Sequence, residues 1–175
     1  MIEKFYSHWP VMALALAAAM ASGCASGAGG KSSIHDMGIG SKKYTAHSII
    51  FNRSAPPSVS EKKFRCEMES LNRSDLRSYR FSNFLSNGAE PDVVVTLAIS
   101  GRNAGLGIYN SVGTALAEYT NGKAVENMAE FELRGNEGVT KIKWYLGEDN
   151  ILSVFESYDA TGVLGGSENT IYISR

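Results

Sequence analysis

The feature that most constrains the fold is the alternation of apolar and polar residues through positions 128–158. A period of two is typical of β-strands, because successive side chains of a strand point to opposite faces of the sheet. Gly and Asn interrupt the alternation near 135–138 and 147–150, where short turns are expected. The segment therefore predicts three consecutive antiparallel strands with one apolar face.

The registers of these strands follow from centring the turns on 136–137 and 148–149. The pairs that result put apolar side chains together on one face and opposite charges together on the other: Phe131 with Ile142, Ala129 with Trp144, Leu146 with Ile151, Glu130 with Lys143, and Lys141 with both Glu132 and Glu156. A slip of one residue would turn Phe131 and Trp144 outward. The pattern thus predicts one specific meander, with cross-strand charge pairs that contribute about 0.2–1 kcal/mol each.

The same period extends over most of the chain, and turn-forming residues separate the segments. Strands are predicted at 44–52, 64–70, 77–85, 92–100, 107–112, 114–120, 128–134, 140–146, 151–158 and 170–174. We expect an all-β fold, an antiparallel, meander-rich β-sandwich, with a partly open β-barrel as the second choice.

The dipeptide Asn121-Gly122 is the strongest two-residue hairpin signal in the chain. A hairpin centred there sets the charged Glu118 opposite Val125, which breaks the separation of the two faces. Either a bulge shifts the register or a helical turn begins at Ala124, and the sequence leaves both open.

The first residues have the layout of a secretory signal, with an apolar run from Val11 to Ala21. The run ends in Ala21-Ser22-Gly23-Cys24, which resembles the lipobox of bacterial lipoproteins. The resemblance implies a signal peptide over 1–23, a lipid on Cys24 and, because Ala25 is not Asp, localisation at the outer membrane. The alternative is cleavage after Ala21, which would give a secreted or periplasmic soluble protein.

Residues 24–43 begin with the lipidated cysteine and are rich in Gly and Ser, so we expect a flexible tether. Residues 44–175 are then a single β domain. Cys66 is the only cysteine besides Cys24. It alternates with Phe64 and Met68, which favours a buried, unreactive thiol over a partner for Cys24.

Charge and motifs exclude several classes of function. Beyond the leader the chain has nearly equal numbers of basic and acidic residues, which argues against nucleic-acid binding. His35 falls in the predicted tether and His47 in the first strand, without the arrangement that nucleophilic catalysis or a metal site needs. We expect no enzyme activity, no cofactor and no metal.

Three tyrosines remain as candidates for a partner-binding face: Tyr145, Tyr158 and Tyr172. If all three lie on the outer side of neighbouring strands, they form an amphipathic patch of the kind enriched at interfaces. The sequence therefore predicts a non-catalytic binding or structural module of the cell envelope, whose partner is another envelope protein or a glycan. The alternatives are a carrier of an apolar ligand in a barrel cavity and an envelope hydrolase.

Overall fold

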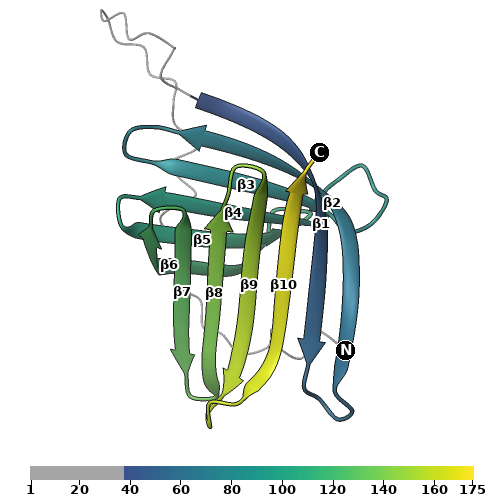
Figure 1. Cartoon of the computed structure of the whole chain (residues 1–175). Coiled ribbons are helices and arrows are strands. Elements are labelled where there is room, and N and C mark those ends of the chain that lie inside the picture. The colour runs from purple at the N-terminus through teal and green to yellow at the C-terminus, as the bar shows by residue number, and fades with distance from the viewer. Residues whose placement is uncertain (1–37) are drawn as a thin grey trace, which may run out of the picture. The chain divides into compact units, whose positions relative to one another are not determined.

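The computed structural model describes residues 38–175, which are folded into antiparallel strands (Figure 1). Within this range there are ten: β1 (Gly38–Asn52), β2 (Ser58–Asn72), β3 (Arg77–Phe84), β4 (Val93–Ser100), β5 (Asn103–Asn110), β6 (Ala115–Val125), β7 (Met128–Gly135), β8 (Gly138–Leu146), β9 (Asn150–Asp159) and β10 (Leu164–Ser174). Each overlaps one of the strands predicted from the alternation. The all-β expectation is confirmed.

The strands form a closed barrel rather than the sandwich that we expected first. Every strand pairs with the next in sequence, and β1 closes the ring on β10, from Tyr44 opposite Ser174 to Asn52 opposite Gly166. Alternation shows only that each strand has a buried face. Whether the first and last strands pair depends on long-range contacts, so the sequence pattern does not distinguish the two architectures.

The barrel nevertheless resembles two layers. In Figure 1, β7 to β10 run lengthwise, whereas β3 to β6 run across behind them. The long strands β1 and β2 belong to both layers, since one half of β1 pairs with β10 and the other half of β2 pairs with β3. On the remaining side only three residue pairs, Lys123–Glu130 to Val125–Met128, join β6 to β7.

Within residues 38–175, this uneven closure leaves strand edges without a neighbour. The segment Ser58–Phe64 of β2 pairs with β1, but the β3 ladder begins only at Arg65. On the other side, residues 131–135 of β7 extend past the last pair with β6. Below the crossing layer, the inner face of the sheet is therefore less covered: Phe155, which points inward, is 37% exposed.

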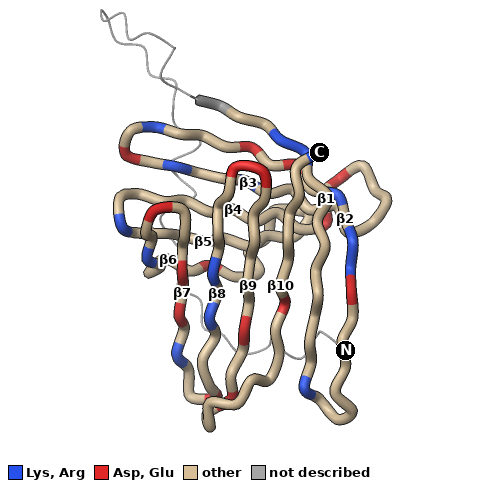
Figure 2. The backbone as a smooth tube through the Cα atoms, viewed as in Figure 1, with Lys and Arg blue, Asp and Glu red and all other residues tan. Residues whose placement is uncertain are grey.

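The predicted registers of the meander are confirmed. Glu130 lies opposite Lys143, and Lys141 lies between Glu132 and Glu156 on the outer face of the barrel. Figure 2 shows the resulting acidic, basic and acidic segments on β7, β8 and β9. The inner face carries the apolar partners.

Two sequence expectations need correction. Asn121-Gly122 makes no hairpin: it lies inside β6, where a bulge shifts the register with β5, and the turn comes at Glu126-Asn127. Gly122 is required for packing, because a Cβ there would overlap the ring of Phe131. In addition, β1 begins at Gly38, so residues 38–43 belong to a strand rather than to the predicted tether.

The inside of the barrel is filled by its own side chains. Aromatic rings from five strands, β1, β2, β3, β8 and β10, meet there, with centroids 4.9 Å apart for Phe81 and Trp144 and 5.5 Å for Phe81 and Tyr172. Aliphatic residues of β4 and β5, among them Leu97 and Leu106, cover the rings from the crossing layer.

Candidate functional site

An apolar row crosses the outer face of the barrel. Cross-strand pairs join Met128 to Tyr145, Tyr145 to Leu152, and Leu152 to Ile171, from β7 to β10. Tyr145 is 40% exposed and Ile171 is 37% exposed, while Met128 and Leu152 are half-buried. We call these four residues the outer band.

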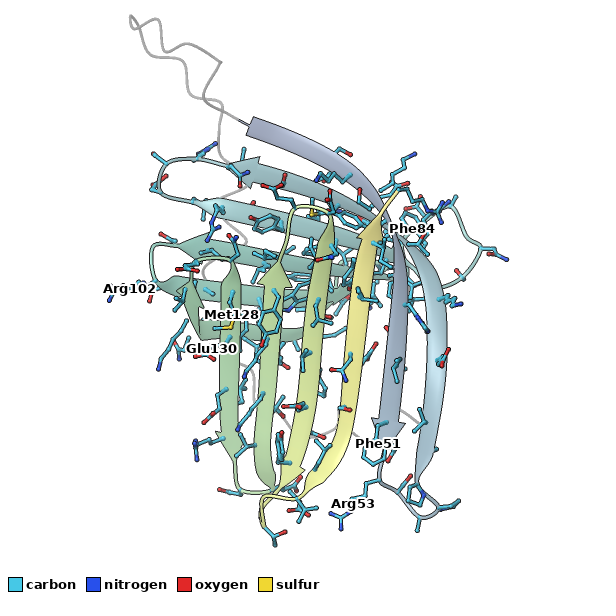
Figure 3. The ribbon with its side chains drawn as sticks, viewed as in Figure 1. Phe51, Arg53, Phe84, Arg102, Met128 and Glu130 are labelled. Atoms are coloured by element: carbon cyan, nitrogen blue, oxygen red, sulfur yellow. The ribbon has the colours of Figure 1, made fainter. Side chains whose placement is uncertain are left out.

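Further apolar side chains border the outer band. Val154 lies next to Leu152 on the same side of β9 and is half-buried, and Ile173, on β10, is 53% exposed. Val125 is 61% exposed and lies opposite Met128. Charged residues, including Glu130 beside Met128 on β7, begin one step farther along the strands (Figure 3). The arrangement is an apolar stripe with a polar rim, as in many protein interfaces.

The sequence located this surface only through Tyr145. Leu152 and Ile171 were missed, because apolar residues in an alternating pattern are assigned to the core by default. The signal that would have identified them is the predicted register itself, which already placed Leu152 on the side of Tyr145 and Lys141.

Tyr158 is on the outer face as predicted, but it does not belong to the outer band. It pairs with Val139, six positions along β8 from Tyr145, so that the two tyrosines lie roughly 20 Å apart. Its hydroxyl donates to Glu156 at 2.9 Å, and the Lys141 ammonium group lies 5.2 Å from its ring centre. The hydrogen bond to Glu156 raises the pKa of Tyr158.

Tyr172 is inside the barrel, so the expectation that it lies on the outer face is wrong. Its side chain is 3% exposed, with the Trp144 ring 6.0 Å away and the Phe64 ring 6.3 Å away. Its hydroxyl has hydrogen-bonding neighbours in Asn83 and Ser153, and burial raises its pKa. These partners let the tyrosine occupy the core, while Ile171 and Ile173 take the outer positions.

Buried polar groups also occur inside the barrel. The hydroxyls of Ser48 and Thr170, both buried, are 2.6 Å apart across β1 and β10. The Asn83 Oδ1 acceptor and the Trp144 Nε1 donor are buried without a partner within the described residues. An unpartnered buried donor and acceptor each cost free energy.

The histidine and metal candidates give no reactive cluster. His47 lies on β1 with Nε2 3.1 Å from the Glu61 carboxylate on the exposed side of β2. Asp159 closes its own turn by accepting from the backbone N–H groups of Thr161 and Val163. In residues 38–175, no three His, Cys, Asp or Glu side chains are grouped as metal ligands would be.

Of the two cysteines, Cys66 lies within the described residues. Cys66 is fully buried on the inner face of β2, and burial raises the pKa of its thiol to about 12. The predicted buried thiol is confirmed. Cys24, together with the predicted signal peptide and His35, lies outside the described residues.

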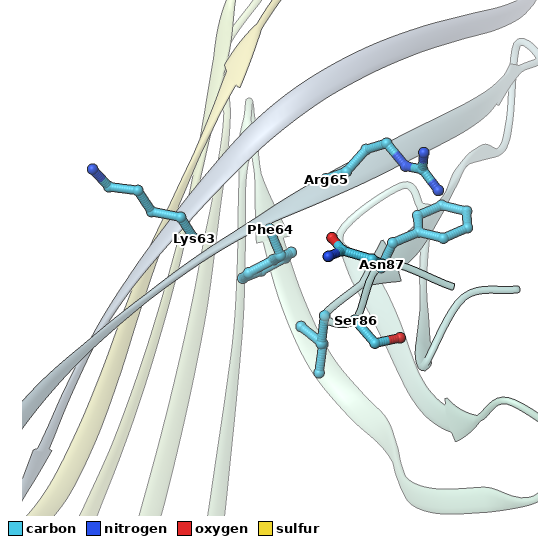
Figure 4. Close-up of a pocket in the computed structure, with 7 residues that line it drawn as sticks. Lys63, Phe64, Arg65, Ser86 and Asn87 are labelled. Atoms are coloured by element: carbon cyan, nitrogen blue, oxygen red, sulfur yellow. The ribbon is translucent and has the colours of Figure 1, made fainter. Parts of the chain in front are cut away.

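A shallow pocket of about 290 Å³ lies where β3 leaves β2. Its lining comes from β2 and from the end of β3 with the loop that follows: Lys63, Phe64, Arg65, Phe84, Leu85, Ser86 and Asn87. Figure 4 shows Phe64 and Arg65 pointing to opposite sides of β2. The Arg65 guanidinium lies 4.1 Å from the centre of the Phe84 ring and donates to the Gly88 carbonyl at 3.4 Å.

Neither the protein-family models nor the curated proteins contain a match to this sequence. The part of the chain from Gly38 onward has no helix with the length and apolar character of a membrane span.

Proposed function

We propose that this protein is a lipid-anchored, non-catalytic binding module of the bacterial outer membrane. Its lipid would be carried on Cys24, and its docking surface would be the outer band, which binds another envelope protein. The observation that carries the proposal is the continuous row Met128–Tyr145–Leu152–Ile171 on the outer face. Exposed apolar patches with a polar rim mark interaction sites in soluble domains.

The composition of the band favours a protein over a glycan as partner. Leu152 and Ile171 offer aliphatic surface, which Ile173 extends at the border of the band, and Tyr145 supplies one aromatic ring with a polar end. Protein interfaces bury such surface against apolar side chains, and one aromatic anchor often dominates the binding energy. Binding to a glycan instead is an outcome that the crosslinking test below distinguishes.

The position of Cys66 supports the anchored form over the secreted alternative. The secreted form would have both cysteines free to pair, but the Cys66 thiol is enclosed by the barrel. A disulfide would have to bring Cys24 into a core that contains Tyr44, Phe64 and Tyr172. A lipidated Cys24 needs no such rearrangement.

The anchor is tested by the intact mass of the protein extracted from membranes, next to a Cys24→Ser variant. We expect a lipid-sized increment that disappears in the variant. A chain that begins at Ser22 and is two hydrogens lighter than the reduced form would overturn the anchored reading, because it would show a Cys24–Cys66 disulfide.

The outer band is tested with a photo-crosslinking residue at position 145, in cells, with position 158 as the matched control. We expect a specific protein adduct from position 145 and not from position 158, and we expect Ile171→Asp to abolish it. Equal adducts at both positions, or adducts of glycan only, would contradict the protein-docking surface.

A carrier of an apolar ligand is the second candidate. It is favoured by the partly open inner face, where Phe155 is 37% exposed and Ile50 is half-buried. Organic extraction of the purified protein followed by mass spectrometry tests it. A stoichiometric lipid that is lost in Phe155→Lys would favour the carrier over the docking module.

A further inference from the structure

Among the described residues, one edge of β2 has no neighbouring strand, and this free edge is a second surface with the features of a binding site. Ser58–Phe64 pairs on one side with β1, from Ser58 opposite Asn52 to Phe64 opposite Ala46. On the other side the β3 ladder ends at the pair Arg65–Phe84. Every second residue of this seven-residue segment therefore directs its backbone N–H and C=O away from the sheet.

The edge is open because the chain turns away from β2 after Phe84. The Asp92 carboxylate accepts from the backbone N–H of Leu85 at 2.8 Å and of Ser86 at 2.9 Å, and also from the Ser86 hydroxyl. These bonds bend the loop back toward the start of β4. Arg65 holds the same loop through the Gly88 carbonyl.

The shallow pocket lies at the end of β3, where the next residue would lie if β3 continued along β2. Phe64, which is half-buried, faces inward here and packs against the Tyr172 ring. A strand from a binding partner could continue along β2 in the direction of β3, starting just past Phe84. Its first residue would then lie opposite Phe64. The apolar side chains of Phe64, Phe84 and Leu85 form part of the lining of the pocket at that position.

The charged side chains along the edge indicate which kind of strand it would bind. Lys62 on the inner side and Lys63 on the outer side are both exposed. The acidic residue between them and the turn, Glu61, is paired with His47 at 3.1 Å. Lysines on a free edge hinder pairing with neutral strands, and the same charges favour a strand with acidic residues opposite them.

The free edge of β7 lacks these features. On β7, Glu132 is engaged by Arg134 at 2.6 Å. Its charges are therefore mixed and already paired, whereas the β2 edge presents two neighbouring lysines beside a pocket.

We propose that Ser58–Phe64 of β2 binds an extended acidic polypeptide segment by antiparallel strand addition, with an apolar side chain of the guest against Phe64 and acidic side chains opposite Lys62 and Lys63. Backbone hydrogen bonds supply the affinity of such complexes, and the side chains opposite supply the specificity. This surface is separate from the outer band and does not depend on the lipid anchor.

The test uses a synthetic peptide with the sequence VEEKTVT, which matches β2 from Phe64 back to Ser58, and a charge-reversed control, VKKETVT. Binding is followed by NMR on the protein that begins after the predicted signal peptide, with Cys24→Ser. We expect shift changes confined to the β2 edge and the adjoining loop, and roughly tenfold weaker binding of the control. Added salt should weaken the binding of the acidic peptide.

Proline substitutions at two neighbouring positions, Ser60→Pro and Glu61→Pro, distinguish an effect on the free edge from an effect on the stability of the fold. One removes an N–H that bonds to β1 and lowers Tm, while the other removes an N–H that points outward and leaves Tm nearly unchanged. The variant with the unchanged Tm should lose peptide binding at least tenfold.

Each contrary result overturns the proposal. Equal binding of the two peptides removes the charge selection, shift changes on β7 or the outer band place the site elsewhere, and full binding by the stable proline variant excludes strand addition. The proposal is also overturned if neither peptide binds. Because the outer band is tested by crosslinking at position 145, failure there and failure here are distinguishable.

Discussion

The ring of Tyr172 stacks on the indole of Trp144 inside the barrel, with centroids 6.0 Å apart and planes inclined by 23°. The two residues come from β10 and β8, on either side of β9. Phe81, from the crossing layer, lies within 5.5 Å of both rings. This three-ring contact joins the two layers of the barrel, so its loss affects the whole fold.

Replacing Tyr172 therefore tests the placement of the core. We expect Tyr172→Ala to lower the free energy of unfolding by about 3–5 kcal/mol, as large-to-small aromatic substitutions in cores do. Tyr145→Ala, on the outer face, should cost less than about 1 kcal/mol. Urea denaturation of the two variants measures the difference, and similar losses would contradict the opposite placement of these tyrosines.

The sequence predicts the strands well because alternation is a local property. The registers of β7, β8 and β9 were determined by charge and apolar pairing at short range, and the structure has the same pairs, such as Lys141–Glu156. Closure of the barrel was not predicted, because the pairing of Tyr44 with Ser174 joins the two ends of the domain and has no local signal.

The tyrosine face was predicted less well, for a different reason. In β10, Ile171 and Tyr172 alternate, and hydrophobicity alone assigns the isoleucine to the core. The structure reverses this, because the hydroxyl of Tyr172 has the hydrogen-bonding groups of Asn83 and Ser153 beside it. Whether a tyrosine can be buried depends on partners from distant strands, which one strand's sequence does not contain.

Gly122 provides a test of the corrected position of Asn121-Gly122. A Cβ at this position would overlap the Phe131 ring, so Gly122→Ala should cost about 1–3 kcal/mol through overpacking. The smaller side chain of Phe131→Leu should relieve part of that cost. A double-mutant cycle by chemical denaturation measures the coupling. If Gly122→Ala were neutral, the close packing of β6 on β7 would be wrong.

Two aspartates predict how the loops respond to acid. Hydrogen bonds from Ser86 lower the pKa of Asp92, and hydrogen bonds from Thr161 and Val163 lower that of Asp159. A lowered pKa in the folded state means that these bonds stabilise the loops above the unfolded pKa of 3.8 and are lost as the pH falls below it.

We therefore expect the amides of Ser86 and Val163 to lose protection from hydrogen exchange at acidic pH before the barrel strands do. NMR hydrogen exchange over a pH series measures this, corrected for the intrinsic exchange rate. An Asp92→Asn variant should remove most of the pH dependence at Ser86 and leave that at Val163 unchanged. A loss of protection that begins in β8 or β9 would contradict this order.

Cys66 predicts the response to alkaline pH. Burial raises the pKa of its thiol from 9.0 to about 12, so the folded protein keeps a proton that the unfolded chain releases. Between these two values, rising pH favours the unfolded state, by about 1.4 kcal/mol per pH unit for one group. We expect Cys66→Ala to lose stability less steeply than the parent protein between pH 9 and pH 11. Other buried groups, Tyr172 among them, are common to both proteins, so the difference between the two curves isolates Cys66.

The same burial predicts that a thiol reagent labels Cys66 only after denaturation. Parallel stability curves together with rapid labelling of the native protein would show that the thiol is accessible, and that the barrel does not enclose it.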